Sequence, residues 1–439
     1  AQIADTVRVG GRTENIVDAI GTTNADGRNL LMAVAGDKYD ATKNVGLYVD
    51  NTIAVDRDAT DAKLFVGNIN ENDKPAGSIS FGSNAVVVID FGSFSADQAV
   101  FDAEQLIVNS DSTVLLRGAD RIGSVKLVEN GTTTEDGQRL EKVLDKNDVN
   151  AWLNYKVEQV QGEDNTTNVN LNVVFDQNAT GDEDLNAFAE SVLTTGSESL
   201  GVVNAIGTAY FDETTKKLSA VGEDALDEYM ALPAVAGTYN AAYDAAEQVW
   251  NTIGAHNIDR TAGKTNGVWA DVFYSANEAG DMYGNGYGYE ADVYGGVLGY
   301  DYTAACGGKI GAALTIGTSD VDAKGDFVGD YGNDADFWGL SIYASKDITD
   351  KMIVSADITY LSLDNDIKGS VAGASVAESI DSSVISVGLR ADWKAYESNA
   401  FEIVPHAGIR YAQIDVDDYR EMDGESLDVL EMPIGVAFN

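Results

Sequence analysis

Apolar and polar residues alternate along the C-terminal part of the chain. Eight segments have this pattern and are separated by stretches rich in Gly, Asp, Asn and Ser; they lie near 267–275, 291–302, 309–319, 336–346, 352–363, 382–394, 401–412 and 430–438. A period of two predicts β-strands with two distinct faces. In 382–394, for example, Val387 and Leu389 fall on one face, whereas Ser386 and Arg390 fall on the other.

The length of these segments distinguishes two kinds of sheet. Strands of soluble sheets usually have about 5–6 residues, whereas strands that cross an outer membrane need about 9–11. The predicted strands have about 9–13 residues, and aromatic residues gather near their ends, as in the girdles of outer-membrane barrels. We therefore predict a mainly β protein with an antiparallel transmembrane β-barrel over residues 263–439. A soluble β-sandwich is the alternative.

The alternation also assigns side chains to the two sides of the barrel wall. The outer face would meet lipid, and its aromatic residues are Tyr300, Tyr302, Trp338, Tyr360, Trp393 and Tyr411. The inner face would line a wet lumen with the polar residues Lys309, Ser386, Arg390, Asp392, Glu402, His406 and Arg410. Glycines that alternate with tyrosines in the segment 287–302 would leave the lumen open.

A helical pattern precedes the first predicted strand. Residues from about 182 to 256 are rich in Ala, Glu and Leu, and apolar residues recur at helical spacing in 238–254. The acidic stretch 182–186 is typical of a helix N-terminus, where carboxylates meet the positive end of the helix dipole. A helix over 238–254 would be roughly 24 Å long, close to the thickness of the hydrocarbon layer.

The same helix is predicted to lie inside or at the mouth of the barrel, because only about ten residues connect it to the first strand. Tyr243 and Trp250 would lean on one wall of the lumen. Asp244 and Glu247 would approach lumen cations such as those at 309, 390 and 410.

The N-terminal part, residues 1–178, has short apolar strand cores separated by Gly, Asn and Asp. Four cores begin at Lys63, Val86, Gln105 and Val125, a spacing of roughly 20 residues that would suit a β-solenoid with one strand core per unit. A β-sandwich with regular hairpins is the alternative. The segment Asn168–Phe175 alternates clearly and is predicted to be the last strand of this part.

Composition limits the possible functions. The formal net charge of −44 excludes a general nucleic-acid binder, because such a chain would repel phosphates. Cys306 is the only cysteine, which excludes an internal disulfide or a cysteine-based metal site. No window of about 18 apolar residues predicts a transmembrane helix. The first residues have no signal-peptide pattern, so we expect a mature chain, a fragment or a cytosolic protein.

The sequence predicts no catalytic, cofactor-binding or metal-binding residues. His256 ends the predicted helix and His406 falls on the inner face of a strand, and both are expected to be ordinary polar positions rather than members of a catalytic triad. The segment 176–187 begins like a calcium loop but has Ala187 where a bidentate glutamate is needed. A weak surface calcium site remains possible in the acidic stretch 363–366.

Together these parts resemble the type V autotransporters. The motifs that carry the resemblance are GVWADVFYS, YGGVLGYDY, WGLSIYAS, VGLRADW, VPHAGIRY and MPIGVAF, and with the preceding helix they cover roughly residues 238–439. The resemblance implies a passenger over 1–178, a helical linker with a pore helix over 179–262 and a translocator barrel over 263–439. It implies a barrel in the bacterial outer membrane and a passenger on the cell surface, where adhesion is the expected role.

The resemblance also implies partners and a departure. The expected partners are outer-membrane lipid, the barrel-assembly machinery, periplasmic chaperones and a host or surface ligand of the passenger. Family barrels have twelve strands, whereas about eight are predicted here, so we expect an incomplete barrel; a closed eight-stranded porin-type or anchor barrel is the alternative. A soluble surface-layer or adhesive β-protein is a third hypothesis. The asparagine pair at which some family members are cleaved has no counterpart in this chain.

Overall fold

The computed structural model divides into two units, Ala1–Ser219 and Ala220–Asn439, each described here by itself. The structure describes residues 2–3, 7–8, 45–49, 53–54, 63–66, 77–82, 85–95, 98–108, 113–117, 119–129, 131–133, 151–161, 167–258, 266–282, 287–305, 307–397, 402–420 and 422–438. Among these residues, no helix is both long and apolar enough to span a membrane.

The first unit contains three sheets built mainly from parallel strands. One consists of β5 (Lys63–Val66), β6 (Ser78–Phe81), β9 (Gln105–Val108) and β12 (Thr132–Thr133). The second consists of β2 (Val7–Arg8), β3 (Val45–Val49), β7 (Ala85–Asp90) and β10 (Thr113–Arg117). The third contains β1 (Gln2–Ile3), β4 (Ile53–Ala54), β8 (Ala99–Asp102), β11 (Gly123–Val128), β14 (Thr167–Phe175) and β13 (Leu153–Gln161).

From β6 onward the chain visits these three sheets in turn. Ser78 pairs with Gln105 and Gln105 pairs with Thr132, so parallel neighbours are 27 residues apart. The same offset joins Ala99 to Lys126 in another sheet. The predicted 20-residue spacing was therefore wrong. Successive apolar cores lie in different sheets, so the distance between cores is shorter than the distance between paired strands.

An antiparallel hairpin and two helices follow the parallel strands. β14 pairs with both β11 and β13, and Val169, Leu171 and Val173 are buried, which confirms the alternation predicted there. Helix α3 (Glu183–Thr195) begins after Asp182, whose side chain accepts hydrogen bonds from the backbone of the first turn, as the acidic sequence predicted. Helix α4 (Leu200–Ala209) and the hairpin β15 (Phe211–Asp212) and β16 (Lys217–Leu218) complete the unit.

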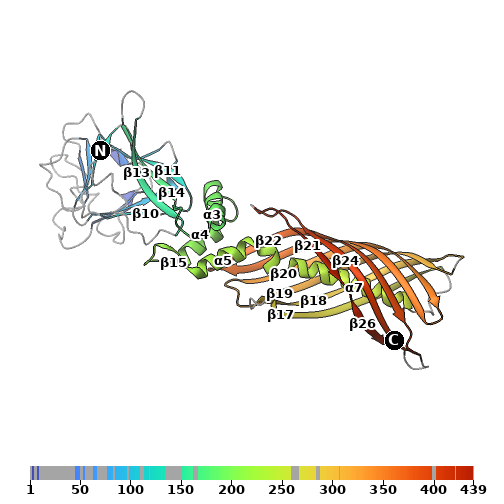
Figure 1. Cartoon of the computed structure of the whole chain (residues 1–439). Helices are drawn as coiled ribbons and strands as arrows, with labels where there is room; N and C mark the ends of the chain where they lie inside the picture. The colour runs from blue at the N-terminus through green and yellow to red at the C-terminus, as the bar shows by residue number, and fades with distance from the viewer. Residues whose placement is uncertain are drawn as a thin grey trace. The chain divides into compact units, whose positions relative to one another are not determined.

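The second unit is a curved antiparallel sheet with a helix on its concave side. The helices are α5 (Ala220–Met230), α6 (Leu232–Val235) and α7 (Thr238–Ile258). The long strands are β17 (Gly267–Met282), β18 (Tyr287–Thr303), β19 (Lys309–Gly325), β20 (Asp330–Thr349), β21 (Met352–Val371), β22 (Ala374–Trp393) and β24 (Glu402–Val416). The short strands are β23 (Tyr396–Glu397), β25 (Ser426–Glu431) and β26 (Ile434–Phe438). Figure 1 shows α7 enclosed by the strands.

Each predicted barrel segment overlaps one of these strands, but the strands are longer than predicted. β20, β21 and β22 each have 20 residues, whereas apolar alternation marks only their middle parts. Ladder hydrogen bonds join backbone groups, so pairing continues where charged side chains occupy the outer face. The hydrophobic pattern therefore indicates the lipid-crossing part of a strand and not its full length.

The sheet does not close upon itself among the described residues. β17 pairs only with β18, and β25 and β26 both pair with β24, on the other side of the sheet. The alternative of a closed eight-stranded barrel was therefore wrong for this structure. Such a barrel also has no room for α7, because side chains alone fill an interior of that size.

Candidate functional site

Helix α7 lies against the inner face of the sheet through its small residues. Ala241, Ala242, Ala245 and Ala246 are fully buried and pack against inner-face residues of several strands, including Val293, Val297, Ala313, Val321, Ala335, Leu361 and Leu363. Small side chains on both surfaces let the helix approach the wall closely. The predicted wet lumen was therefore wrong where α7 lies, since the helix covers an inner face that is largely apolar.

Trp250 is the main anchor of α7 on the wall. The guanidinium of Arg390 lies 4.9 Å from the centre of the Trp250 ring, and that of Arg410 lies 5.9 Å from it. Gly388 and Gly408 make room for the ring, because a Cβ added to them would lie 2.6 and 3.0 Å from it. Stacking of a guanidinium on an aromatic face is favourable, particularly where water is excluded. These contacts hold the centre of the helix.

The lumen cations take their anionic partners from the barrel. Nε of Arg390 lies 2.9 Å from the Asp392 carboxylate, and Nε of Arg410 lies 2.8 Å from the Glu431 carboxylate. The third cation, Lys309, pairs with Asp301 at 3.4 Å. Strand residues distant in sequence thus neutralise one another across the inner face.

The helix carboxylates behave differently from the prediction. Asp244 and Glu247 form no ion pair among the residues that the structure describes, and Asp244 is buried. Tyr243 is the polar contact that was found instead. Its hydroxyl donates to Glu431, and Arg410 lies 4.7 Å from the centre of its ring.

The C-terminal end of α7 is tied to the wall by a cluster of polar and aromatic residues. Nε2 of His256 lies 2.8 Å from Oδ2 of Asp301, and the His256 ring stacks on Trp269 with centres 3.9 Å apart. The Tyr343 hydroxyl donates to Asp301 at 2.5 Å and accepts from Nε1 of Trp269 at 2.6 Å. His256 is thus a structural anchor, which sequence reasoning treated only as an ordinary polar position.

Inner-face glycines are covered by aromatic rings and do not leave the lumen open as predicted. A Cβ on Gly299 would lie 2.3 Å from the Trp269 ring, and one on Gly295 would lie 2.6 Å from the Phe273 ring. Both glycines stand opposite these aromatic residues on the neighbouring strand. Each glycine therefore provides space for a large ring on the adjacent strand.

The remaining polar residues assigned to the inner face lie at different places on it. Ser386 is buried on β22, and Asp392 is buried beside Arg390. The His406 ring meets Trp250 edge to face, with centres 6.3 Å apart. Glu402 lies at the beginning of β24, where it pairs with Lys394 at 2.9 Å.

The outer face carries a continuous apolar band. One row of cross-strand neighbours contains, in order, Val268, Tyr300, Ala312, Ile342, Ile358, Val387, Tyr411 and Leu430, and all of them are exposed. The other assigned aromatic residues, Tyr302, Trp338, Tyr360 and Trp393, are exposed on the same face. An exposed apolar surface of this extent is typical of contact with lipid.

A row of carboxylates borders this band on one side. Asp292, Asp320, Asp334 and Asp366 are neighbours on successive strands and are all exposed on the outer face. Charged residues are costly at the centre of a membrane wall but are tolerated near its surfaces. The strands thus extend beyond the hydrocarbon layer at the end where α5 and α6 lie.

No group of three or more residues among the described part of the chain is arranged to hold a metal ion. The contacts of His256 and His406 described above are with carboxylate and aromatic side chains. The site is therefore a helix fastened inside a barrel, with ion pairs and ring stacking as its chemistry.

Comparison with known proteins agrees with this architecture. Residues 268–439 match the family model of the autotransporter beta-domain. No curated protein matches the chain. Similar solved structures include the translocator domain of autotransporter NalP from Neisseria meningitidis, with 14% identity, a TM-score of 0.37, and 46% of this chain and 70% of that chain covered. Another is the beta domain of the Bordetella autotransporter BrkA, with 16% identity, a TM-score of 0.31, and 40% and 70% covered.

The family match confirms the resemblance drawn from the strand motifs. It covers the strands β17 to β26, including the inner-face residues that hold α7 and the apolar outer band. Residues 268–439 therefore belong to the autotransporter β-domain family, which makes this part of the chain the outer-membrane translocator barrel of a type V autotransporter.

Proposed function

We propose that this barrel anchors the chain in the outer membrane and exports the chain's own N-terminal part to the cell surface. The observation that supports this most strongly is the position of α7. Its C-terminal end is fastened through His256 to Asp301, near the beginning of β17, and its N-terminal end continues into α6 and α5. The chain that precedes α7 thus leaves the barrel at the opposite end from the first strand.

We assign the end with α5 and α6 to the cell exterior. At this end the strands continue beyond the apolar band, and their outer face carries Asp334 and Asp366. At the other end, β20 and β21 are joined by the short turn at Asp350 and Lys351. Long exterior extensions and short periplasmic turns are typical of outer-membrane barrels. Assembly of the barrel would involve the barrel-assembly machinery and periplasmic chaperones.

For the N-terminal part we propose a β-solenoid passenger with an adhesive role. The 27-residue pairing offset and the three sheets support a solenoid, whose stacked strands offer extended surfaces to a binding partner. The partner would be a host or surface ligand. Cells that display the protein should adhere to a host-cell layer or a matrix-coated surface more than cells displaying the barrel alone.

Export is tested by epitope tags at two turns of the full-length protein. One tag is inserted between Thr214 and Thr215, in the turn of the β15–β16 hairpin, and a matched tag between Asp350 and Lys351. Antibody should label the first tag on intact cells, whereas the second should require a permeabilised outer membrane. Both tags should fractionate with the outer membrane. Labelling of the second tag alone on intact cells would reverse the orientation, and a water-soluble protein would contradict the proposal.

A further inference from the structure

A buried carboxylate joins α5 to a loop of the barrel. Glu228 is only 4% exposed, and its carboxylate accepts hydrogen bonds from the backbone N–H groups of Val328 and Gly329, at 2.9 and 3.0 Å. These two residues lie in the connection between β19 and β20, about a hundred positions further along the chain. Hydrogen bonds to a charged acceptor are stronger than neutral ones, and losing a buried acceptor leaves both donors without a partner.

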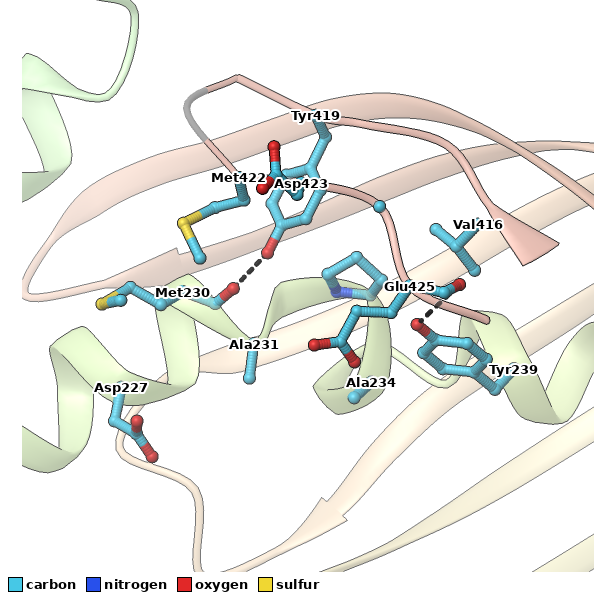
Figure 2. Close-up of a pocket in the computed structure, with 12 residues that line it drawn as sticks. Asp227, Met230, Ala231, Ala234, Tyr239, Val416, Tyr419, Met422, Asp423 and Glu425 are labelled. Atoms are coloured by element: carbon cyan, nitrogen blue, oxygen red, sulfur yellow. Dashed lines mark hydrogen bonds between the residues drawn. The ribbon is translucent and has the colours of Figure 1, made fainter. Parts of the chain in front are cut away.

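A second set of contacts joins the same short helices to the other side of the barrel. The Tyr419 hydroxyl donates to the backbone carbonyl of Met230, at the end of α5, and both residues are visible in Figure 2. The Arg420 guanidinium lies 5.5 Å from the centre of the Tyr229 ring and pairs with Glu378 of β22. The segment α5–α6 is thus held between the β19–β20 connection and the β24–β25 connection.

The two sides are not equally tight. Between α5–α6 and the β24–β25 connection lies a pocket of about 230 Å³, and Figure 2 shows Asp227, Asp423 and Glu425 among its lining residues. Tyr239 spans this side, with its hydroxyl 3.4 Å from the Glu425 carbonyl oxygen. A polar, solvent-accessible pocket contributes little packing, so the Glu228 side holds the segment more firmly.

The position of α5–α6 is coupled to that of α7. Only Ala236 and Gly237 separate the two helical segments. Gly237 has a φ of +74°, and a Cβ on it would lie 2.7 Å from Cγ1 of Val321 on β19, so the sharp turn lies directly against the wall. The short helices can reach their place only when α7 is inside the barrel.

We propose that α5–α6 is a lid that closes the exterior mouth of the barrel after α7 has entered, and that Glu228 is the positioning residue that holds it closed. This rests on the proposed export function, because the chain must have passed through the barrel before the lid can form. The lid gives export a final step in which the mouth is sealed. Glu228 acts through the backbone of Val328 and Gly329 and not through any contact with a transported segment.

The test measures access to a residue beneath the lid. Thr238, the first residue of α7, is fully buried and is close in size to cysteine. In the full-length protein with Cys306→Ser and Thr238→Cys, a bulky aqueous thiol reagent should label intact cells slowly. Glu228→Ala should increase the labelling rate at least about tenfold, as expected for the loss of a charged acceptor of two hydrogen bonds. Glu228→Gln, whose amide oxygen still accepts, should stay much closer to the unmodified protein.

The matched control is Asp224→Ala, which removes an exposed carboxylate one turn earlier on the same helix and should leave labelling unchanged. Amide hydrogen exchange at Val328 and Gly329, measured on the purified protein in micelles, should accelerate in Glu228→Ala only. Unchanged exchange and unchanged labelling in Glu228→Ala, with the passenger tag still accessible on cells, would overturn the lid. A passenger tag that never reaches the surface would instead count against export itself.

Discussion

Nε2 of His256 lies 2.8 Å from Oδ2 of Asp301, so the last turn of the pore helix is fastened to the end of β18. Asp301 also receives the Tyr343 hydroxyl and the Lys309 ammonium group. One buried carboxylate therefore connects the helix to three separate strands. At the other end of the helix, Glu228 has the corresponding role, so the interior is fixed at both ends.

The first prediction concerns this lower anchor. His256→Ala removes a partner of Asp301 and the ring stacked on Trp269, and should lower the free energy of unfolding by about 2–4 kcal/mol. Urea unfolding of the barrel in micelles measures the change. Asp347→Ala, at an exposed position of β20, serves as the control and should stay within about 0.5 kcal/mol. A change in His256→Ala no larger than the control would contradict the anchor.

The second prediction concerns the room made for Trp250. Gly388→Ala would place a methyl group 2.6 Å from Nε1 of Trp250 and should cost about 1–3 kcal/mol by overpacking. Trp250→Ala should cost about 3–5 kcal/mol through the cavity it leaves. In the double variant the new methyl group has space, so the two costs should fall short of adding by about 1 kcal/mol. Strict additivity in the same unfolding assay would count against direct contact.

The third prediction concerns the two faces of β22. Leu389 is 53% exposed within the apolar band, so Leu389→Arg should cost about 2–4 kcal/mol in a bilayer or micelle. Asp381→Arg, on the same outer face but beyond the band, should cost far less. The sequence alone would predict a mild effect of arginine at the inner residue Ser386. Because Ser386 is only 1% exposed, we now expect Ser386→Arg to be as damaging as Leu389→Arg.

The fourth prediction concerns the pH dependence of the lid. Burial, and secondarily the charge of Asp224, raise the pKa of Glu228 above its usual value of 4.5, although Val328, Gly329 and Tyr331 oppose the shift through hydrogen bonds. The closed lid therefore binds this proton more tightly than the open lid. Lowering the pH through the raised pKa, toward 4.5, should stabilise the closed state, and raising the pH should remove that gain.

Hydrogen exchange at Val328 and Gly329, corrected for the intrinsic rate at each pH, measures this effect. Protection should rise as the pH falls from 7 toward 5 in the unmodified protein. Glu228→Gln, which cannot titrate, should give a flat profile over the same range. Protection that falls with pH in the unmodified protein, or a slope that persists in Glu228→Gln, would contradict the assignment to Glu228.

Local patterns predicted the features that depend on local sequence. The alternation around Val387 and Leu389 assigned the faces of β22, because successive side chains of a strand always point to opposite sides. Asp182 marked the beginning of α3 because a carboxylate satisfies free backbone donors there. The strand β13 was missed, although Leu153, Tyr155 and Val157 alternate with polar residues in the sequence and gave the same kind of signal.

Contacts between distant residues could not be predicted in the same way. Arg410 pairs with Glu431 because β24 and β25 are neighbours in register, whereas the sequence pattern favoured the helix carboxylates equally well. Glu228 reads as one more acidic residue of a helix, and nothing near it in the sequence points to Val328. The glycines opposite Trp269 and Phe273 looked like open space, because periodicity does not reveal which neighbour fills a gap.

The constant offset between parallel strands of the first unit sets a quantum of length for that part of the chain. Gln105 stands exactly one block after Ser78 and one block before Thr132, and the two other sheets follow the same count. A deletion or insertion of 27 residues here would shorten or lengthen the stack by one layer and keep every sheet aligned. Any other number would misalign all three sheets at once, so gene changes that survive in this region should come in that unit.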